Sequence, residues 1–106
     1  MAISEKGKRR ITVEGRRYLW WVFDEYDQGW FDGPQVNVAT PEQDLFIRYG
    51  LQQQDERRCA WVRYRQDEPV QKLCPQFEQE EGILTPKDIR SLILWALSTD
   101  EDANHK

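Results

Sequence analysis

The chain has 106 residues and a net charge of −4 at pH 7, and 39% of its residues are hydrophobic and 12% aromatic. This length and composition predict one globular domain and argue against a disordered chain. No apolar run approaches the ~20 residues of a membrane span, and no apolar segment follows a basic N-terminus, so neither a span nor a signal peptide is expected.

The first predicted element is a β-hairpin, preceded by a flexible lead-in over residues 1–7. Residues 9–13 and 16–23 flank Glu14-Gly15, a two-residue turn with glycine where a positive φ is needed. This turn sets a register in which Val13 faces Arg16, Ile11 faces Tyr18 and Arg9 faces Trp20.

The two faces of this hairpin differ in composition. The better core face carries Ile11, Val13, Tyr18, Trp20 and Val22. The opposite face is half basic and half aromatic or aliphatic, and carries Arg10, Thr12, Arg17, Leu19, Trp21 and Phe23.

Residues 24–34 are punctuated by glycine and proline and predict a loop, which unusually carries Trp30 and Phe31. Further strands are predicted over 36–38, 45–49, 59–65 and 70–74, the last at an edge because Pro75 follows it. If Arg65 pairs with Val70 across the last turn, Trp61 opposes Cys74 and Cys59 lies diagonal to Cys74. Diagonal neighbours are ~7–8 Å apart, too far for a disulfide, so two reduced cysteines are expected in a cytoplasmic protein.

The final element is a helix over residues 85–97. Thr85 is placed to cap it, Pro86 to open it and Asp88 to complete a capping box. Its predicted buried stripe is Ile89, Leu92, Ile93 and Ala96, with Leu94, Trp95 and Leu97 beside it. Strands in succession followed by a helix predict an α+β fold: an antiparallel meander of five or six strands with one C-terminal helix packed on one face. The domain is expected over residues 8–98, with a disordered acidic tail over 99–106.

The hairpin residues Tyr18-Leu19-Trp20-Trp21-Val22 and the helix that begins Thr85-Pro86-Lys87-Asp88-Ile89-Arg90 together resemble a group of small single-domain bacterial proteins of unassigned function. The similarity covers roughly residues 8–98. It implies a bacterial cytoplasmic protein and supports the predicted architecture, but it supplies no catalytic residue.

Catalytic and metal-binding motifs are scarce in this sequence. The single histidine, His105, lies in the acidic tail, which argues against nucleophilic mechanisms that need an imidazole. Asp24, Glu25, Asp27 and Asp32 cluster near the glycines of the 24–34 loop, but their spacing does not match a Ca²⁺ loop. No cofactor or metal is therefore expected, and solvated turn residues are the simpler interpretation of these carboxylates.

The tryptophans point to a binding surface. Trp20, Trp61 and Trp95 are expected in the core, whereas alternation directs Trp21 to the other face of the sheet. Because one helix covers one face, Leu19, Trp21 and Phe23 need other cover: a strongly curved sheet that closes on itself, the loop with Trp30 and Phe31, or a partner. The expected binding residues are Arg10, Arg17, Leu19, Trp21, Phe23, Trp30 and Phe31.

Three functions compete on these observations. The first is a non-enzymatic protein-interaction module, an adaptor or regulator that binds a protein partner or a second copy of itself. The second is a single-stranded nucleic-acid binder in which Lys8, Arg10, Arg17 and Trp21 contact phosphates and a base. The chain beyond residue 20 holds nine basic against seventeen acidic residues, which makes nucleic acid the weaker choice. The third is an enzyme that uses the loop carboxylates.

Overall fold

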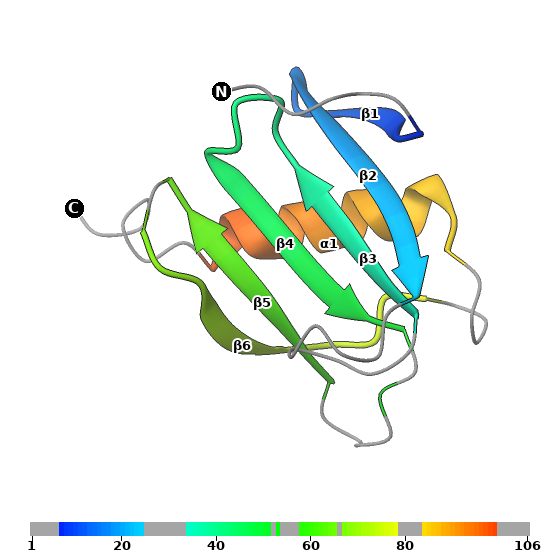
Figure 1. Ribbon diagram of the computed structural model, residues 1–106, viewed down its shortest axis with the longest axis vertical. Helices are drawn as coiled ribbons and strands as arrows, with labels where there is room; N and C mark the ends of the chain where they lie inside the picture. The colour runs from blue at the N-terminus through cyan, green and yellow to red at the C-terminus, as the bar shows by residue number, and fades with distance from the viewer. Residues whose placement is uncertain are drawn as a thin grey trace.

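The computed structural model describes residues 7–24, 34–51, 53, 58–65, 67–78 and 84–99. Six strands form one antiparallel sheet in meander order, and one helix follows them (Figure 1). The elements are β1 (Arg9–Val13), β2 (Arg16–Asp24), β3 (Pro34–Ala39), β4 (Leu45–Gly50), β5 (Arg58–Tyr64), β6 (Val70–Cys74) and α1 (Pro86–Ser98). The predicted α+β meander with one C-terminal helix is therefore confirmed, with six strands. Within the described residues, no helix has the length and apolar character needed to cross a bilayer.

The β1–β2 hairpin has the predicted turn and register. Glu14 and Gly15 have φ angles of 51° and 81°, the left-handed pair that matches the twist of the flanking strands. Arg9 pairs with Trp20, Ile11 with Tyr18 and Val13 with Arg16. The local turn chemistry alone therefore determines which hairpin residues share a face.

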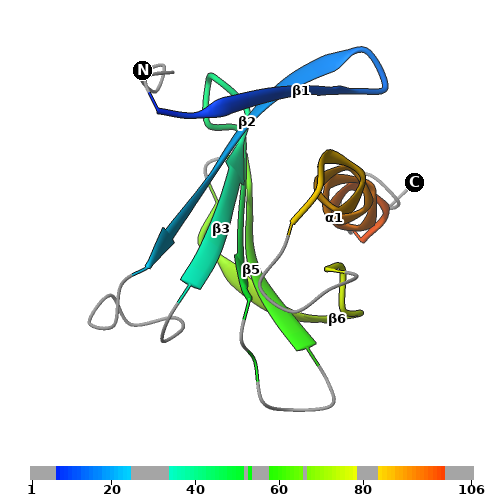
Figure 2. The same ribbon diagram turned by 90° about the vertical axis from the view of Figure 1, so that its right-hand side faces the viewer.

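The sheet is strongly curved, and its concave face holds α1 (Figure 2). Residues of β1 to β5 meet the helix in one apolar core, and Cys74 of β6 packs at its margin. The buried strand members of this core include Val13, Tyr18, Trp20, Val36, Val38, Ile47, Tyr49, Ala60, Val62 and Tyr64. The buried helix residues are Ile89, Leu92, Ile93 and Ala96, as predicted, together with Asp88. Leu94, Trp95 and Leu97 pack at the margin of this core.

Both ends of α1 have polar partners. At the N-terminus, Thr85 accepts a hydrogen bond from the Asp88 N–H, and the Asp88 carboxylate accepts one from the Thr85 N–H, which completes the predicted capping box. The last turn contains no basic residue of its own. Instead, the Lys72 ammonium of β6 donates to the Thr99 carbonyl and to the Tyr64 hydroxyl, and so places a positive charge at the negative end of the helix dipole.

The capping box predicts a specific loss of stability. Thr85→Ala removes the acceptor for the Asp88 N–H, and we expect it to lower the free energy of unfolding by about 1 kcal/mol in urea titrations. The matched control is Ser91→Ala, on the exposed side of the same helix, which should leave stability unchanged or slightly raised because alanine is the better helix former. Equal losses in the two variants would contradict a capping role for Thr85.

Three sequence expectations about packing are wrong. Val22 is 50% exposed rather than buried. The first residue of β1, Arg9, pairs with Trp20, so Val22 lies beyond the part of β2 that β1 covers. Trp61 does not face the core, because Ala60, Val62 and Tyr64 are the buried members of β5 and Trp61 alternates with them.

The third correction concerns the β5–β6 register. Val70 pairs with Val62, not with Arg65. The Arg65 N–H donates to the Asp44 carbonyl of another turn, and Pro69 has no N–H, so neither residue can extend the ladder. Consequently Arg58 opposes Cys74 and Cys59 opposes Leu73, and the two cysteines lie on opposite faces of the sheet.

The Asp44 carboxylate joins the β1–β2 hairpin to the β3–β4 turn. It accepts hydrogen bonds from the Arg16 guanidinium and the Thr40 hydroxyl. The Arg16 hydrogen bond, followed by that of Thr40, lowers the pKa of Asp44 below its ordinary value of 3.8. Because the pKa of Asp44 is lowered in the folded state, its stabilising effect is present at neutral pH and is lost as the pH falls through that lowered value.

We expect Asp44→Asn to reduce the free energy of unfolding at pH 7 by less than about 1 kcal/mol, because both ionic partners are more than one-third exposed and solvent screens the pair. The difference from wild type should shrink as the pH falls below 3.8 and through the lowered pKa of the folded state, where the wild-type carboxylate also becomes neutral. Urea titrations at pH 7 and pH 3 measure this difference in the free energy of unfolding. Asp67→Asn, whose carboxylate lies 3.9 Å from Arg65 Nε, is the control and should have the smaller effect. A difference that grows toward acid would contradict this prediction.

Candidate functional site

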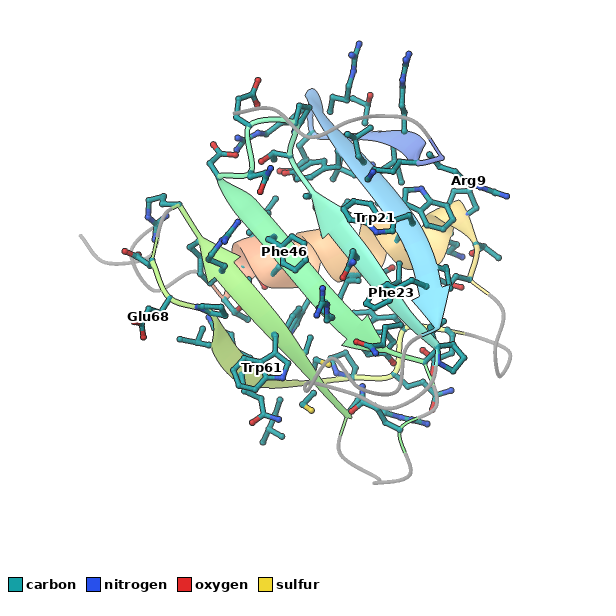
Figure 3. The ribbon with its side chains drawn as sticks, in the orientation of Figure 1. Arg9, Trp21, Phe23, Phe46, Trp61 and Glu68 are labelled. Carbon is teal, nitrogen blue, oxygen red and sulfur yellow. The ribbon has the colours of Figure 1, made fainter. Side chains whose placement is uncertain are left out.

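The candidate site is the outer face of the sheet, defined here as the face turned away from α1. Paired positions place Trp21, Asn37, Arg48 and Trp61 in one row across β2–β5, and Leu19, Ala39, Phe46 and Arg63 in the next. Figure 3 shows Trp21, Phe23 and Phe46 in front of the sheet, with α1 behind it. The outer face therefore carries four aromatic side chains from four different positions on β2, β4 and β5.

Basic side chains lie over these aromatic rings. Lys8 Nζ is 4.7 Å from the ring centroid of Trp21, and Arg48 Cζ is 4.9 Å from that of Phe23. Arg48 and Arg63 both approach Phe46, at 5.5 and 5.7 Å. Each distance is within the ~6 Å range of a cation–π interaction. The cations therefore lie above an apolar layer of aromatic rings.

This arrangement buries the centre of the sheet on its second face. Leu19 is fully buried although it lies outside the core around α1, and Asn37 and Ala39 of β3 are buried beside it. Arg48 Nε donates to Asn37 Oδ1 at 2.9 Å, so its side chain extends across β3 toward β2. The sheet ends at β1 and β6 and does not close on itself, so the cover seen among the described residues comes from the long side chains of neighbouring strands, which was not expected from the sequence.

The large side chains of this face remain partly exposed. Trp21, Phe23, Phe46 and Trp61 are all intermediate in exposure. At the β6 edge, Leu73 is 64% exposed and shares the outer face with its partner Cys59. The aromatic layer is therefore continuous with an exposed aliphatic edge near Trp61.

Charge is distributed very unevenly over the molecule. Five basic residues share the outer face, namely Lys8, Arg10, Arg17, Arg48 and Arg63, and no outward strand position in the described ranges holds Asp or Glu. The described turns β1–β2, β3–β4 and β5–β6 meet at one end of the sheet, as they must in a meander. Those turns carry most of the described acidic residues, namely Glu14, Glu42, Asp44, Asp67 and Glu68, of which Glu68 is labelled in Figure 3. A basic face thus ends at an acidic border.

The structure brings together five of the seven predicted binding residues. Arg10, Arg17, Leu19, Trp21 and Phe23 all lie on the outer face, although Leu19 is fully covered. Trp30 and Phe31 lie outside the described residues.

Sequence reasoning missed Phe46, Arg48, Trp61 and Arg63. Their alternation with buried residues was visible in 45–49 and 59–65, but only the strand register shows that they share a face with Trp21.

Most of the predicted carboxylate cluster lies outside the described residues. Asp24 is the last residue of β2, and Glu25, Asp27 and Asp32 lie in the part of the chain that is not described. Among the residues that the structure describes, no group of three His, Cys, Asp or Glu side chains is placed to hold a metal ion.

Tyr49 of β4 and Glu78, which follows β6, form a buried pair on the concave side of the sheet. The Tyr49 hydroxyl donates to Glu78 Oε2 at 2.6 Å and accepts from the Phe77 N–H. Burial, and then this carboxylate, raise the pKa of Tyr49, so the hydroxyl remains a donor at neutral pH. The hydrogen bond satisfies two buried polar side chains and anchors the segment after β6 to the core.

The cysteines are free thiols, as expected. The Cys59 N–H donates to the Gln53 side chain at 2.9 Å, and Cys74 packs at the margin of the core. Burial raises the pKa of the Cys74 thiol from 9.0 to about 12. Because Cys59 and Cys74 lie on opposite faces of the sheet, they cannot form a disulfide without rearrangement of β6.

Cys74 is therefore predicted to be inert. In the Cys59→Ser variant, we expect the remaining thiol to react with an aromatic disulfide reagent at pH 8 at least ten-fold more slowly than in urea-unfolded protein, because the reactive species is the thiolate. The absorbance of the released thiolate measures the rate. The Cys74→Ser variant, with Cys59 as its only thiol, is the comparison, and equally fast folded-state reaction of Cys74 would contradict this prediction.

A cleft of about 310 Å³ opens at the free end of β2, away from the acidic border. Its lining includes Arg9, Trp20, Val22, Leu51 and Leu84. Arg9 Cζ lies 5.4 Å from the Trp20 ring, so one wall is basic and the rest largely apolar.

Comparison with protein-family models, with curated proteins and with solved structures finds no match for this chain.

Proposed function

We propose that the protein is a non-enzymatic protein-interaction module that binds its partner through the outer face of the sheet. The observation that carries this proposal is a face with four partly exposed aromatic side chains and five basic ones, opposite the face that the helix covers. Trp, Tyr and Arg are the residues that most often dominate binding energy in protein interfaces.

The fixed position of the side chains supports this role. Arg48 is hydrogen-bonded to Asn37 and lies over both Phe23 and Phe46, so little side-chain entropy remains to be lost when a partner binds. An adaptor or regulator of this kind needs no reactive group. The proposed setting is the bacterial cytoplasm, which the two free thiols and the resemblance to small bacterial proteins support.

Single-stranded nucleic acid is the second candidate. The same interleaving of cations and aromatic rings occurs where bases stack and phosphates pair. However, Lys8, Arg48 and Arg63 lie over the rings on which bases would stack. The acidic border at one end of the sheet would also repel a polyanion that extends beyond the face.

The test is affinity capture with two charge-matched variants. Arg17→Glu changes an exposed residue of the outer face, and Arg90→Glu makes the same charge change on the exposed side of α1. We expect Arg17→Glu and Trp21→Ala to reduce capture of the wild-type partner at least ten-fold, as truncation of a hot spot does, whereas Arg90→Glu retains it. Quantitative mass spectrometry of the captured proteins provides the measurement.

Circular dichroism and thermal unfolding must first show that each variant is folded. Equal capture by Arg17→Glu, Trp21→Ala and Arg90→Glu proteins would refute the outer face as the binding surface. Light scattering on the wild type separates a partner of different sequence from a second copy of the chain.

A further inference from the structure

We infer that the outer face binds a short acidic protein segment whose carboxylates lie between large apolar side chains. This inference rests on the proposed protein-binding function and specifies the chemistry of the partner. It follows from the sign of the charge on the face, from the position of its apolar edge and from its dimensions.

The charge on the face selects an acidic partner. Lys8, Arg17 and Arg63 reach this face from three different strands or their ends, and no acidic side chain occupies a described outward strand position. The Arg63 guanidinium lies over the Phe46 ring, 5.7 Å from its centroid. A guanidinium that lies over an aromatic ring keeps its edge available to a carboxylate, which accepts two parallel N–H bonds.

A second copy of the chain is a poor occupant for the same reason. A two-fold contact through the outer face would place the same five basic residues against each other. Like charges opposed across an interface disfavour association, and the acidic residues of the border do not lie on this face.

The apolar edge distinguishes a protein segment from a nucleic acid. Leu73 is 64% exposed, and Trp61 lies on the neighbouring strand on the same face. A phosphate backbone gains nothing from an exposed leucine, whereas a leucine or phenylalanine side chain of a peptide would bury it. At the other side of the face, Trp21 offers a second apolar contact.

The dimensions of the face set the length of the segment. Trp21 and Trp61 belong to one row of paired positions on β2 and β5, three strand spacings apart, or roughly 14 Å at ~4.8 Å each. An extended chain crosses that distance in about four to five residues. The matching pattern is therefore an apolar residue, three or four residues rich in Asp or Glu, and another apolar residue.

Three fluorescent probes test this inference: a peptide with the core Leu-Glu-Glu-Glu-Phe, the same peptide with Gln in place of Glu, and a twelve-nucleotide oligothymidylate. Fluorescence anisotropy is measured at low and at physiological salt. We expect the acidic peptide to bind wild type at least ten-fold more tightly than the Gln peptide, with an affinity that falls as salt rises. The oligothymidylate should bind more weakly than the acidic peptide.

Two outer-face variants and one control locate the binding. Arg63→Gln and Arg17→Gln should each weaken binding of the acidic peptide, Arg63→Gln by ten-fold or more, and Arg90→Gln should leave it unchanged. Arg17 is exposed, so its variant keeps the test valid if Arg63→Gln fails to fold.

The contrary outcomes are distinguishable. Equal binding of the acidic and Gln peptides would overturn the inferred acidity of the partner but leave protein binding by the face intact. Tighter binding of the oligothymidylate, lost in Arg17→Gln, would overturn both the inference and the proposed function in favour of nucleic acid. Failure of both peptides to bind wild type would overturn the inference alone, since the capture comparison of Arg17→Glu with Arg90→Glu tests the proposed function independently.

Discussion

The central constraint in this molecule is that β3 is buried on both faces while one helix covers only one of them. On the concave side, Val36 and Val38 contact the α1 core. On the outer side, long side chains from β2, β4 and β5 supply the cover, and Arg48 reaches Asn37 across the strand boundary. Because cations on flexible stems provide part of this cover, the second face is shielded from water and yet presents charge and aromatic carbon at its surface.

The same constraint explains why the charged side chains at the described positions of the outer face are basic. A second sheet face without a helix cannot be wholly apolar without inviting aggregation. Guanidinium and ammonium groups cover aromatic rings favourably, whereas carboxylates would meet the negative faces of those rings. Five of the described acidic residues lie instead in the turns at one end of the sheet. The resulting separation of charge is therefore a product of packing as well as a basis for recognition.

Much of the fold could be predicted from the sequence because its signals are local. The Glu14-Gly15 turn determines the hairpin register, and Thr85 with Asp88 determines where α1 begins. The β5–β6 register could not be predicted, because the Arg65 N–H bonds to the Asp44 carbonyl, a partner 21 positions earlier in the chain. The face of Trp61 was equally hidden, since both alternating sets of β5 contain an aromatic residue and only the pairing with β4 and burial against α1 decide between them. The part of the candidate site on β2 could thus be predicted from the sequence, whereas the part on β4 and β5 depends on the tertiary structure.

Lys72 gives the chain an unusual connection between its last strand and its last helical turn. Its ammonium group bonds the Thr99 carbonyl and the Tyr64 hydroxyl, and the Tyr64 hydroxyl in turn donates to the Ala96 carbonyl. β6 has a neighbour on one side only, and the C-terminal turn of α1 lacks a basic residue of its own. The edge strand β6 and the last turn of α1 therefore stabilise each other through these hydrogen bonds. Opening of one removes a partner of the other, so the amide hydrogens of both should exchange with solvent as one cooperative unit.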